Sequence, residues 1–204
     1  MDNINLNLIK EDCRELVLNL LEYLKKHSKE TYLHSIDVAE KAYVLATSLG
    51  VKKEDLKTLY TASLLHDIGK LCVAEDLLHK KNATENEINV IRASHIEGTT
   101  AILSDYFHSD IVNLAAHHHE RLNSSGYPEH LGAKKLNILD RILQVADVTS
   151  ALEMHRSYKN PYSQEQIVEI LDGLVSHGEL DPKCVEEIKR IVLDPLIAQV
   201  QKDV

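Results

Sequence analysis

Apolar residues recur every three or four positions along most of the chain, which is the spacing of one face of an α-helix. A first run is marked by Leu6, Ile9, Cys13, Leu16, Leu20 and Leu24, and a second by Ile36, Ala39, Tyr43 and Ala46. No segment shows the alternation of apolar and polar residues that a half-buried strand requires. The pattern predicts an all-α fold.

Local end signals set the limits of the later helices. The predicted ranges are about 53–68, 84–104, 109–120 and 136–154, and two further helices begin near residues 163 and 182. Thr84 with Glu87 is a capping-box pair, in which each side chain bonds the backbone of the other residue, and Ser163 with Gln166 and Asp181 ahead of Pro182 are start signals for the last two helices.

Glycine, proline and capping residues indicate where further helices begin or end. Gly50 and Gly69 stand where helices should stop, and Pro195 should kink or end the last helix. Ser109 or Asp110 can cap the helix that ends at about residue 120. Residues 121–135 are rich in Asn, Ser, Gly and Pro, which predicts a long ordered loop.

The length of 204 residues and a hydrophobic content of 44% allow one sizeable core and do not require two. We therefore expect a single compact domain over residues 1–204. Its parts are an N-terminal helix (1–27), a core (28–160) and C-terminal helices (161–204).

Composition excludes several functional classes. Charges interrupt the apolar runs well before the roughly 18 residues that a membrane span needs, and the first residues are polar and acidic, so a cytoplasmic protein without a membrane partner is expected. The net charge of −9, without a basic stripe, argues against binding a nucleic acid polymer. Cys13, Cys72 and Cys184 lack the spacing of a disulfide framework or a thiolate zinc site.

The chain has twelve histidines, and several stand beside acids in helices that should face the core. These residues are Glu30 and His34 at i,i+4, His66, Asp67, His95, the run His117, His118 and His119, and Asp147. A single buried histidine is usually just hydrogen-bonded, but several buried imidazoles and carboxylates together need compensation, which cations supply. Nitrogen and oxygen ligands without thiolate favour iron or manganese, with zinc, nickel and cobalt as alternatives.

The ordered set HDIGK, H, HHE, GYP and VAD resembles the HD-GYP subfamily of the HD-domain metal-dependent phosphohydrolases, over residues 30–159. The resemblance implies a helical bundle with two or three divalent ions between its core helices. The implied metal ligands are His34, His66, Asp67, His95, His118, His119 and Asp147. Asp67 would bridge two ions and be catalytic, and Glu30 matches the extra carboxylate of three-metal members. The alternative for Glu30 is a solvated residue in the first turn of a helix.

The resemblance also implies an activity, the hydrolysis of cyclic di-GMP by a metal-bridging hydroxide to linear pGpG or further to GMP. The alternatives are another nucleotide or phosphate ester as substrate, or a cyclic di-GMP receptor with little turnover. Lys70, Arg156 and Lys159 match cations that bind phosphate or guanine, and Lys70 would take part in catalysis. Tyr127 either contacts the ligand or only shapes the loop.

Some positions depart from the family pattern. Asn123 and Ser124 replace an acid and a glycine before GYP, Ser150 stands where aspartate is common, and Ser157 replaces a proline. None is an implied ligand, so we expect the metal site to persist, while loop geometry, substrate fit and docking of a second copy or signalling partner are affected. His117 and Glu120 are expected to be neighbouring polar residues, with Glu120 orienting a histidine or closing a helix.

Overall fold

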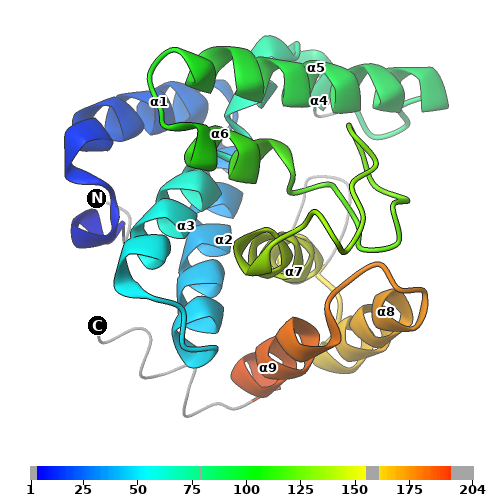
Figure 1. Ribbon diagram of the computed structural model, residues 1–204. Coiled ribbons are helices and arrows are strands. Elements are labelled where there is room, and N and C mark those ends of the chain that lie inside the picture. The colour runs from blue at the N-terminus through cyan, green and yellow to red at the C-terminus, as the bar shows by residue number, and fades with distance from the viewer. Residues whose placement is uncertain (1–3, 79, 155–160, 194–204) are drawn as a thin grey trace.

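The computed structural model describes residues 4–78, 80–154 and 161–193, and these residues are almost entirely helical (Figure 1). The α-helices are α1 (Arg14–His27), α2 (Lys29–Ser48), α3 (Lys53–Leu65), α4 (Glu75–Leu78), α5 (Glu85–Ser104), α6 (Ser109–Ala116), α7 (Ile138–Glu153), α8 (Gln164–Ser176) and α9 (Pro182–Leu193). Three short 3-10 helices are η1 (Leu6–Leu8), η2 (Glu11–Cys13) and η3 (Ile68–Cys72). An all-α fold is therefore confirmed; within the described residues the only extended pairing is a single bridge between Asn123 and Gly132.

The helices enclose one apolar core. Helix α2 packs against α1, α3 and α7, and η3 packs against α5. Residues such as Leu45, Leu59, Leu65 and Leu143 are fully buried in this core. Figure 1 shows α5 at one end of the molecule, α8 and α9 at the other, and α7 between them. The loop that joins α6 to α7 runs along one side between α5 and α7.

Most of the predicted helix ends are confirmed. The Thr84–Glu87 and Ser163–Gln166 capping boxes are both formed, and Gly50 follows α2 at a φ of 74°, a conformation that glycine adopts without cost. Helix α7 begins with a further capping box, between Asn137 and Asp140.

The predicted first helix is wrong at its start. Instead of one helix from Leu6, the chain forms η1 and η2, and α1 begins at Arg14. Two backbone N–H groups in this segment bond to side chains of α3: Asn5 donates to the Tyr60 hydroxyl, and Lys10 donates to the Thr61 hydroxyl. Tertiary hydrogen bonds thus replace helical ones.

Three other limits are also corrected. Helix α3 ends at Leu65, not Ile68, because the chain tightens into η3 where it meets α5. Helix α6 ends at Ala116, so the histidine run lies in a turn. The cap of α6 is His108, whose side chain accepts a bond from the Asp110 N–H, and not Ser109 or Asp110.

Candidate metal centre

One edge of the candidate centre is formed where α2 crosses α7. His34 of α2 and Asp147 of α7 are both buried, and Nε2 of His34 lies 3.0 Å from Oδ1 of Asp147. The other ring nitrogen, Nδ1, lies 3.0 Å from the hydroxyl oxygen of Ser150, one turn further along α7. Ser150, noted only as a departure from a family pattern, therefore orients a predicted ligand.

The His66–Asp67 pair lies where α3 ends. His66 is fully buried, and its Nδ1 lies 2.7 Å from the carbonyl oxygen of Ser63. The Asp67 carboxylate is nearly inaccessible to solvent and points into the same space, with Oδ2 3.5 Å from Nε2 of His66 and 3.9 Å from Nε2 of His34. On its outer side Oδ2 accepts a 2.6 Å hydrogen bond from the ammonium of Lys70.

The opposite side of the centre is formed by α5 and by the turn after α6. His95 of α5 places its Nε2 3.2 Å from Oδ1 of Asp67. His118 packs edge-on against His66 with ring centroids 4.7 Å apart, and its Nδ1 lies 2.6 Å from the Ala115 carbonyl oxygen. His119, which is partly exposed, has its ring centroid 5.1 Å from that of His95.

The centre contains buried nitrogen atoms that no protein group satisfies. Nε2 of His66, His95 and His118 is buried in each case and makes no hydrogen bond. Because Nδ1 of His66 and His118 faces a carbonyl oxygen, Nδ1 carries the proton there, and the Nε2 lone pair points into the centre. Buried polar atoms are rarely left without a partner, and this donor set is what a divalent metal ion requires.

Protonation states agree with metal binding. Burial, together with the neighbouring imidazoles, holds the pKa of His118 well below its usual value, and burial lowers the pKa of His119 to about 3. Burial alone would raise the pKa of Asp67, but Lys70 and the adjacent histidines hold it well below its usual range. Neutral imidazoles beside an ionised carboxylate are the forms that coordinate metal.

The predicted ligands fall into two groups that could each hold a metal ion. One is His34, His66 and Asp67, the other is His95, His118 and His119, and within each group the potential ligand atoms lie within 4.8 Å of one another. Asp147 adjoins the first group through His34 and lies 3.8 Å from Nε2 of His66. All seven residues that the HD-GYP pattern implies as ligands are thus brought together.

Glu30 and His117 belong to neither group. Glu30 is half-buried in the first turn of α2, one turn before His34. His117 instead has its Nδ1 3.4 Å from Oδ1 of Asp140. The expectation that His117 is a neighbouring polar residue agrees with this position.

Glu120 fixes the loop that carries the GYP sequence. Its carboxylate is fully buried and accepts two backbone hydrogen bonds, from Glu129 N–H to Oε1 at 2.6 Å and from Leu131 N–H to Oε2 at 2.8 Å. Glu120 was expected to orient a histidine or close a helix, and instead it holds the far side of the loop. Asn123 also helps to fix this loop, since its side-chain amide donates a hydrogen bond to the His177 carbonyl oxygen, which an aspartate could not do. Ser124 has a φ of 65°, the positive value at which a glycine would be unstrained.

We expect Glu120→Gln to loosen this loop, because the amide of Gln turns one of the two accepting positions into a donor that faces a backbone N–H. One buried hydrogen bond lost in this way destabilises the protein by about 1–3 kcal/mol. Urea unfolding monitored by circular dichroism measures the change. The control is Glu97→Gln on the exposed face of α5, which should leave the free energy of unfolding unchanged. Equal stability of the two variants would contradict the anchoring role of Glu120.

Two further groups line the outer part of the centre. The Tyr127 ring lies against His119, with centroids 4.7 Å apart and planes at 32°. Arg92 of α5 places its guanidinium carbon 5.7 Å from the centroid of the same ring. Arg92 was missed in the sequence, because its local pattern does not distinguish it from other exposed arginines. Arg156 and Lys159, predicted to bind phosphate or guanine, lie outside the described residues.

Comparison with known families assigns the fold. A family model described as HD domain matches residues 11–184. The chain belongs to the HD domain family. A solved HD domain from the Listeria monocytogenes phosphodiesterase PgpH, in complex with cyclic-di-AMP, superposes with a TM-score of 0.65 over 90% of this chain and 96% of that one, at 20% identity. The resemblance to HD-domain proteins seen in the sequence is therefore confirmed.

Two relatives are named for their substrates. A 3'3'-cGAMP-specific phosphodiesterase of Vibrio cholerae is 33% identical over 88% of this chain and 42% of the relative. A cyclic di-GMP phosphodiesterase of Pseudomonas aeruginosa is 29% identical over 87% of this chain and 43% of the relative. The chain thus spans less than half the length of either relative. Within the described residues no helix is both long and apolar enough to cross a membrane.

Proposed function

We propose that this HD domain is a metal-dependent phosphodiesterase of the HD-GYP type that hydrolyses cyclic di-GMP. The observation that carries the proposal is the buried centre itself, in which three unsatisfied imidazole nitrogens converge with the ionised carboxylate of Asp67. Relatives named as cyclic dinucleotide phosphodiesterases support the substrate class. The product is linear pGpG, with GMP as a second product if both phosphodiester bonds are cut.

The positions of the residues support the following proposed roles. His34, His66, Asp67, His95, His118, His119 and Asp147 would hold two divalent ions, with iron or manganese best suited to the donor set. Glu30, one turn before His34, is proposed as the ligand of a third ion. When bound, such ions supply Lewis acidity, which lowers the pKa of water and stabilises the charge that develops on a phosphate during hydrolysis.

Lys70 contributes a positive charge at the edge of the centre. Its ammonium lies beside Asp67, and the Lys70 side chain is 19% exposed, so it can also reach an anion that enters from solvent. We propose that Lys70 binds an oxygen of the scissile phosphate and holds that phosphate beside the ions that Asp67 would help to bind. Tyr127, whose ring lies against His119, is proposed to contact the ligand from that side.

The proposal is tested on protein purified without added metal and then supplied with Mn(II) or Fe(II). Metal content is measured by inductively coupled plasma spectrometry, and turnover is followed by chromatography on cyclic di-GMP, 3'3'-cGAMP and cyclic di-AMP. Two or three ions per chain and many turnovers of cyclic di-GMP are expected. Tight binding with only trace product would favour a receptor for cyclic di-GMP. Turnover of only one of the other dinucleotides would mean that this dinucleotide, and not cyclic di-GMP, is the substrate.

Lys70→Ala should lower kcat/KM for cyclic di-GMP about ten- to a hundredfold, because a charge-assisted hydrogen bond to phosphate contributes about 1.5–3 kcal/mol. Metal content should stay unchanged, since lysine is not a ligand. The matched control is Lys80→Ala, because Lys80 also pairs with a carboxylate at 2.6 Å, that of Glu87, but on the exposed surface. Loss of metal in Lys70→Ala would mean that Lys70 instead positions Asp67.

A further inference from the structure

A row of planar groups leads outward from the candidate metal centre. It begins at the predicted ligand His119, continues with the Tyr127 ring at 4.7 Å, and ends at the guanidinium of Arg92, 5.7 Å from the centroid of Tyr127. His119 and Tyr127 are partly exposed and Arg92 is exposed, so the row runs from the interior to the solvent. Two separate segments build it, the α6–α7 loop and α5.

The charge of Arg92 is not neutralised within the described part of the chain. Arg92 forms no salt bridge with a carboxylate there, whereas Arg141 pairs with Asp181 at 2.9 Å and Arg190 pairs with Glu187 at 2.6 Å. In a chain with a net charge of −9, an arginine beside the centre and without an acidic partner is available to a ligand.

The guanidinium group offers two kinds of contact at this position. Contact with an aromatic ring holds the planar group in place and leaves N–H donors at its edge free. Two such donors match the O6 and N7 acceptors of guanine, and a base can also stack on the guanidinium plane. Adenine presents an amino donor in place of O6, so it cannot accept the same pair of bonds.

We propose that Arg92, held by Tyr127, binds the O6/N7 edge of a guanine base and makes the site prefer guanine-containing cyclic dinucleotides to cyclic di-AMP. This inference rests on the proposed function, and it requires a dinucleotide whose phosphate lies at the metal centre to extend one base toward the outer end of the row. Arg92 is then a specificity-determining residue, distinct from the phosphate-binding role of Lys70.

The test compares Arg92→Ala and Arg92→Lys with the wild type in the metal-loaded protein. With cyclic di-GMP, Arg92→Ala should raise KM about ten- to a hundredfold, the range of one bidentate base contact, with kcat and metal content unchanged. With cyclic di-AMP the same variant should match the wild type. Arg92→Lys should behave like Arg92→Ala, because lysine keeps the charge but lacks the planar pair of donors.

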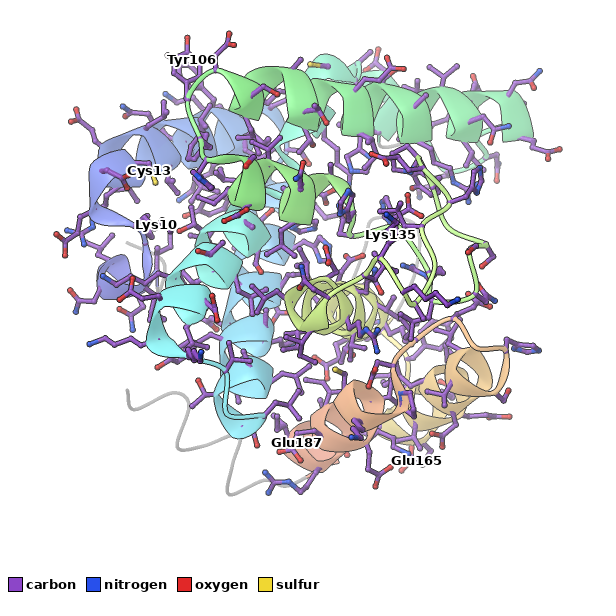
Figure 2. The ribbon with its side chains drawn as sticks, in the orientation of Figure 1. Lys10, Cys13, Tyr106, Lys135, Glu165 and Glu187 are labelled. Carbon is purple, nitrogen blue, oxygen red and sulfur yellow. The ribbon has the colours of Figure 1, made fainter. Side chains whose placement is uncertain are left out.

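The control is Arg190→Ala, which should leave the KM for both substrates unchanged. Arg190 pairs with Glu187, and Figure 2 labels Glu187 at the end of the molecule opposite α5. A wild-type KM for cyclic di-GMP in Arg92→Lys would overturn the guanine contact, because it would mean that Arg92 binds a phosphate through its charge alone. An equal rise in KM for both substrates in Arg92→Ala would lead to the same conclusion. An unchanged KM in Arg92→Ala would overturn any role of Arg92 in binding.

Failure of the proposed function is recognised separately. If the wild-type protein hydrolyses no cyclic dinucleotide, calorimetric binding of cyclic di-GMP and cyclic di-AMP to the same metal-loaded proteins tests the inference by itself. Weaker binding of cyclic di-GMP alone by Arg92→Ala would then support a guanine site in a receptor. The absence of any binding by the wild type would overturn both proposals.

Discussion

Asp67→Ala should abolish hydrolysis of cyclic di-GMP and remove at least one metal ion per chain. The Asp67 carboxylate belongs to one group of predicted ligands and faces the other: it lies 3.5 Å from Nε2 of His66 in its own group, and 3.2 Å from Nε2 of His95 and 3.9 Å from Nε2 of His118 in the second group. Alanine offers no ligand atom, so the substitution leaves this position without a donor to metal. Elemental analysis of the purified variant measures the metal, and chromatography of the products measures the activity.

A thermal measurement separates loss of a ligand from loss of the fold. A metal that binds only the native state raises its stability, so Mn(II) should raise the Tm of the wild type and raise that of Asp67→Ala much less. Asp172→Ala is the control, since Asp172 pairs with Lys189 at the surface and should keep the full response. Full metal content and activity in Asp67→Ala would refute the metal centre proposed here.

The helices could be predicted because their signals are local. The capping boxes at Thr84 and Ser163 involve residues three apart, and their hydrogen bonds form as the sequence indicates. The N-terminal segment could not be predicted in this way, because its backbone bonds to Tyr60 and Thr61, more than 50 residues away. Helical periodicity shows which face is apolar but not which distant side chain will accept a particular N–H.

The candidate centre was predicted through the order of its motifs rather than through its geometry. Periodicity alone places His34 and Asp147 on inward faces, but only the crossing of α2 and α7 brings them to 3.0 Å. The same crossing explains why Ser150 was noted without a role. Arg92 was missed because an exposed arginine has no distinctive sequence pattern, and only the folded loop brings Tyr127 to it.

Gly69 shows most clearly how the role of a residue in the fold can differ from the role that its sequence indicates. In the sequence it appears to be a helix stop, but its φ is not positive, and it lies inside η3 where this segment meets α5. A Cβ added there would lie 1.9 Å from the His95 carbonyl oxygen and 2.2 Å from the Thr99 backbone nitrogen. The Thr99 hydroxyl also accepts a bond from Gly69 N–H and donates one to the His66 carbonyl oxygen. The missing side chain therefore allows α5 to carry His95 to the centre.

Gly69→Ala should consequently damage both stability and metal binding. The clashing atoms are backbone atoms of α5, which no rotamer change can move, so the cost should reach or exceed the roughly 1–3 kcal/mol typical of overpacking. Moving α5 away from η3 also separates His95 from Asp67, so the variant should bind less metal even where it remains folded. Urea unfolding of the metal-free protein measures the first effect, and metal titration at low temperature measures the second.

Gly173→Ala is the matched control for this substitution. Gly173 lies within α8, and an added Cβ there would meet no atom within 4 Å. Alanine should therefore raise the free energy of unfolding by about 0.5–1 kcal/mol, because it loses less conformational entropy than glycine in a helix. Opposite signs for the two glycines are the expected result. If Gly69→Ala were as stable as the wild type and bound metal equally well, the close approach of η3 to α5 would not be what assembles the centre.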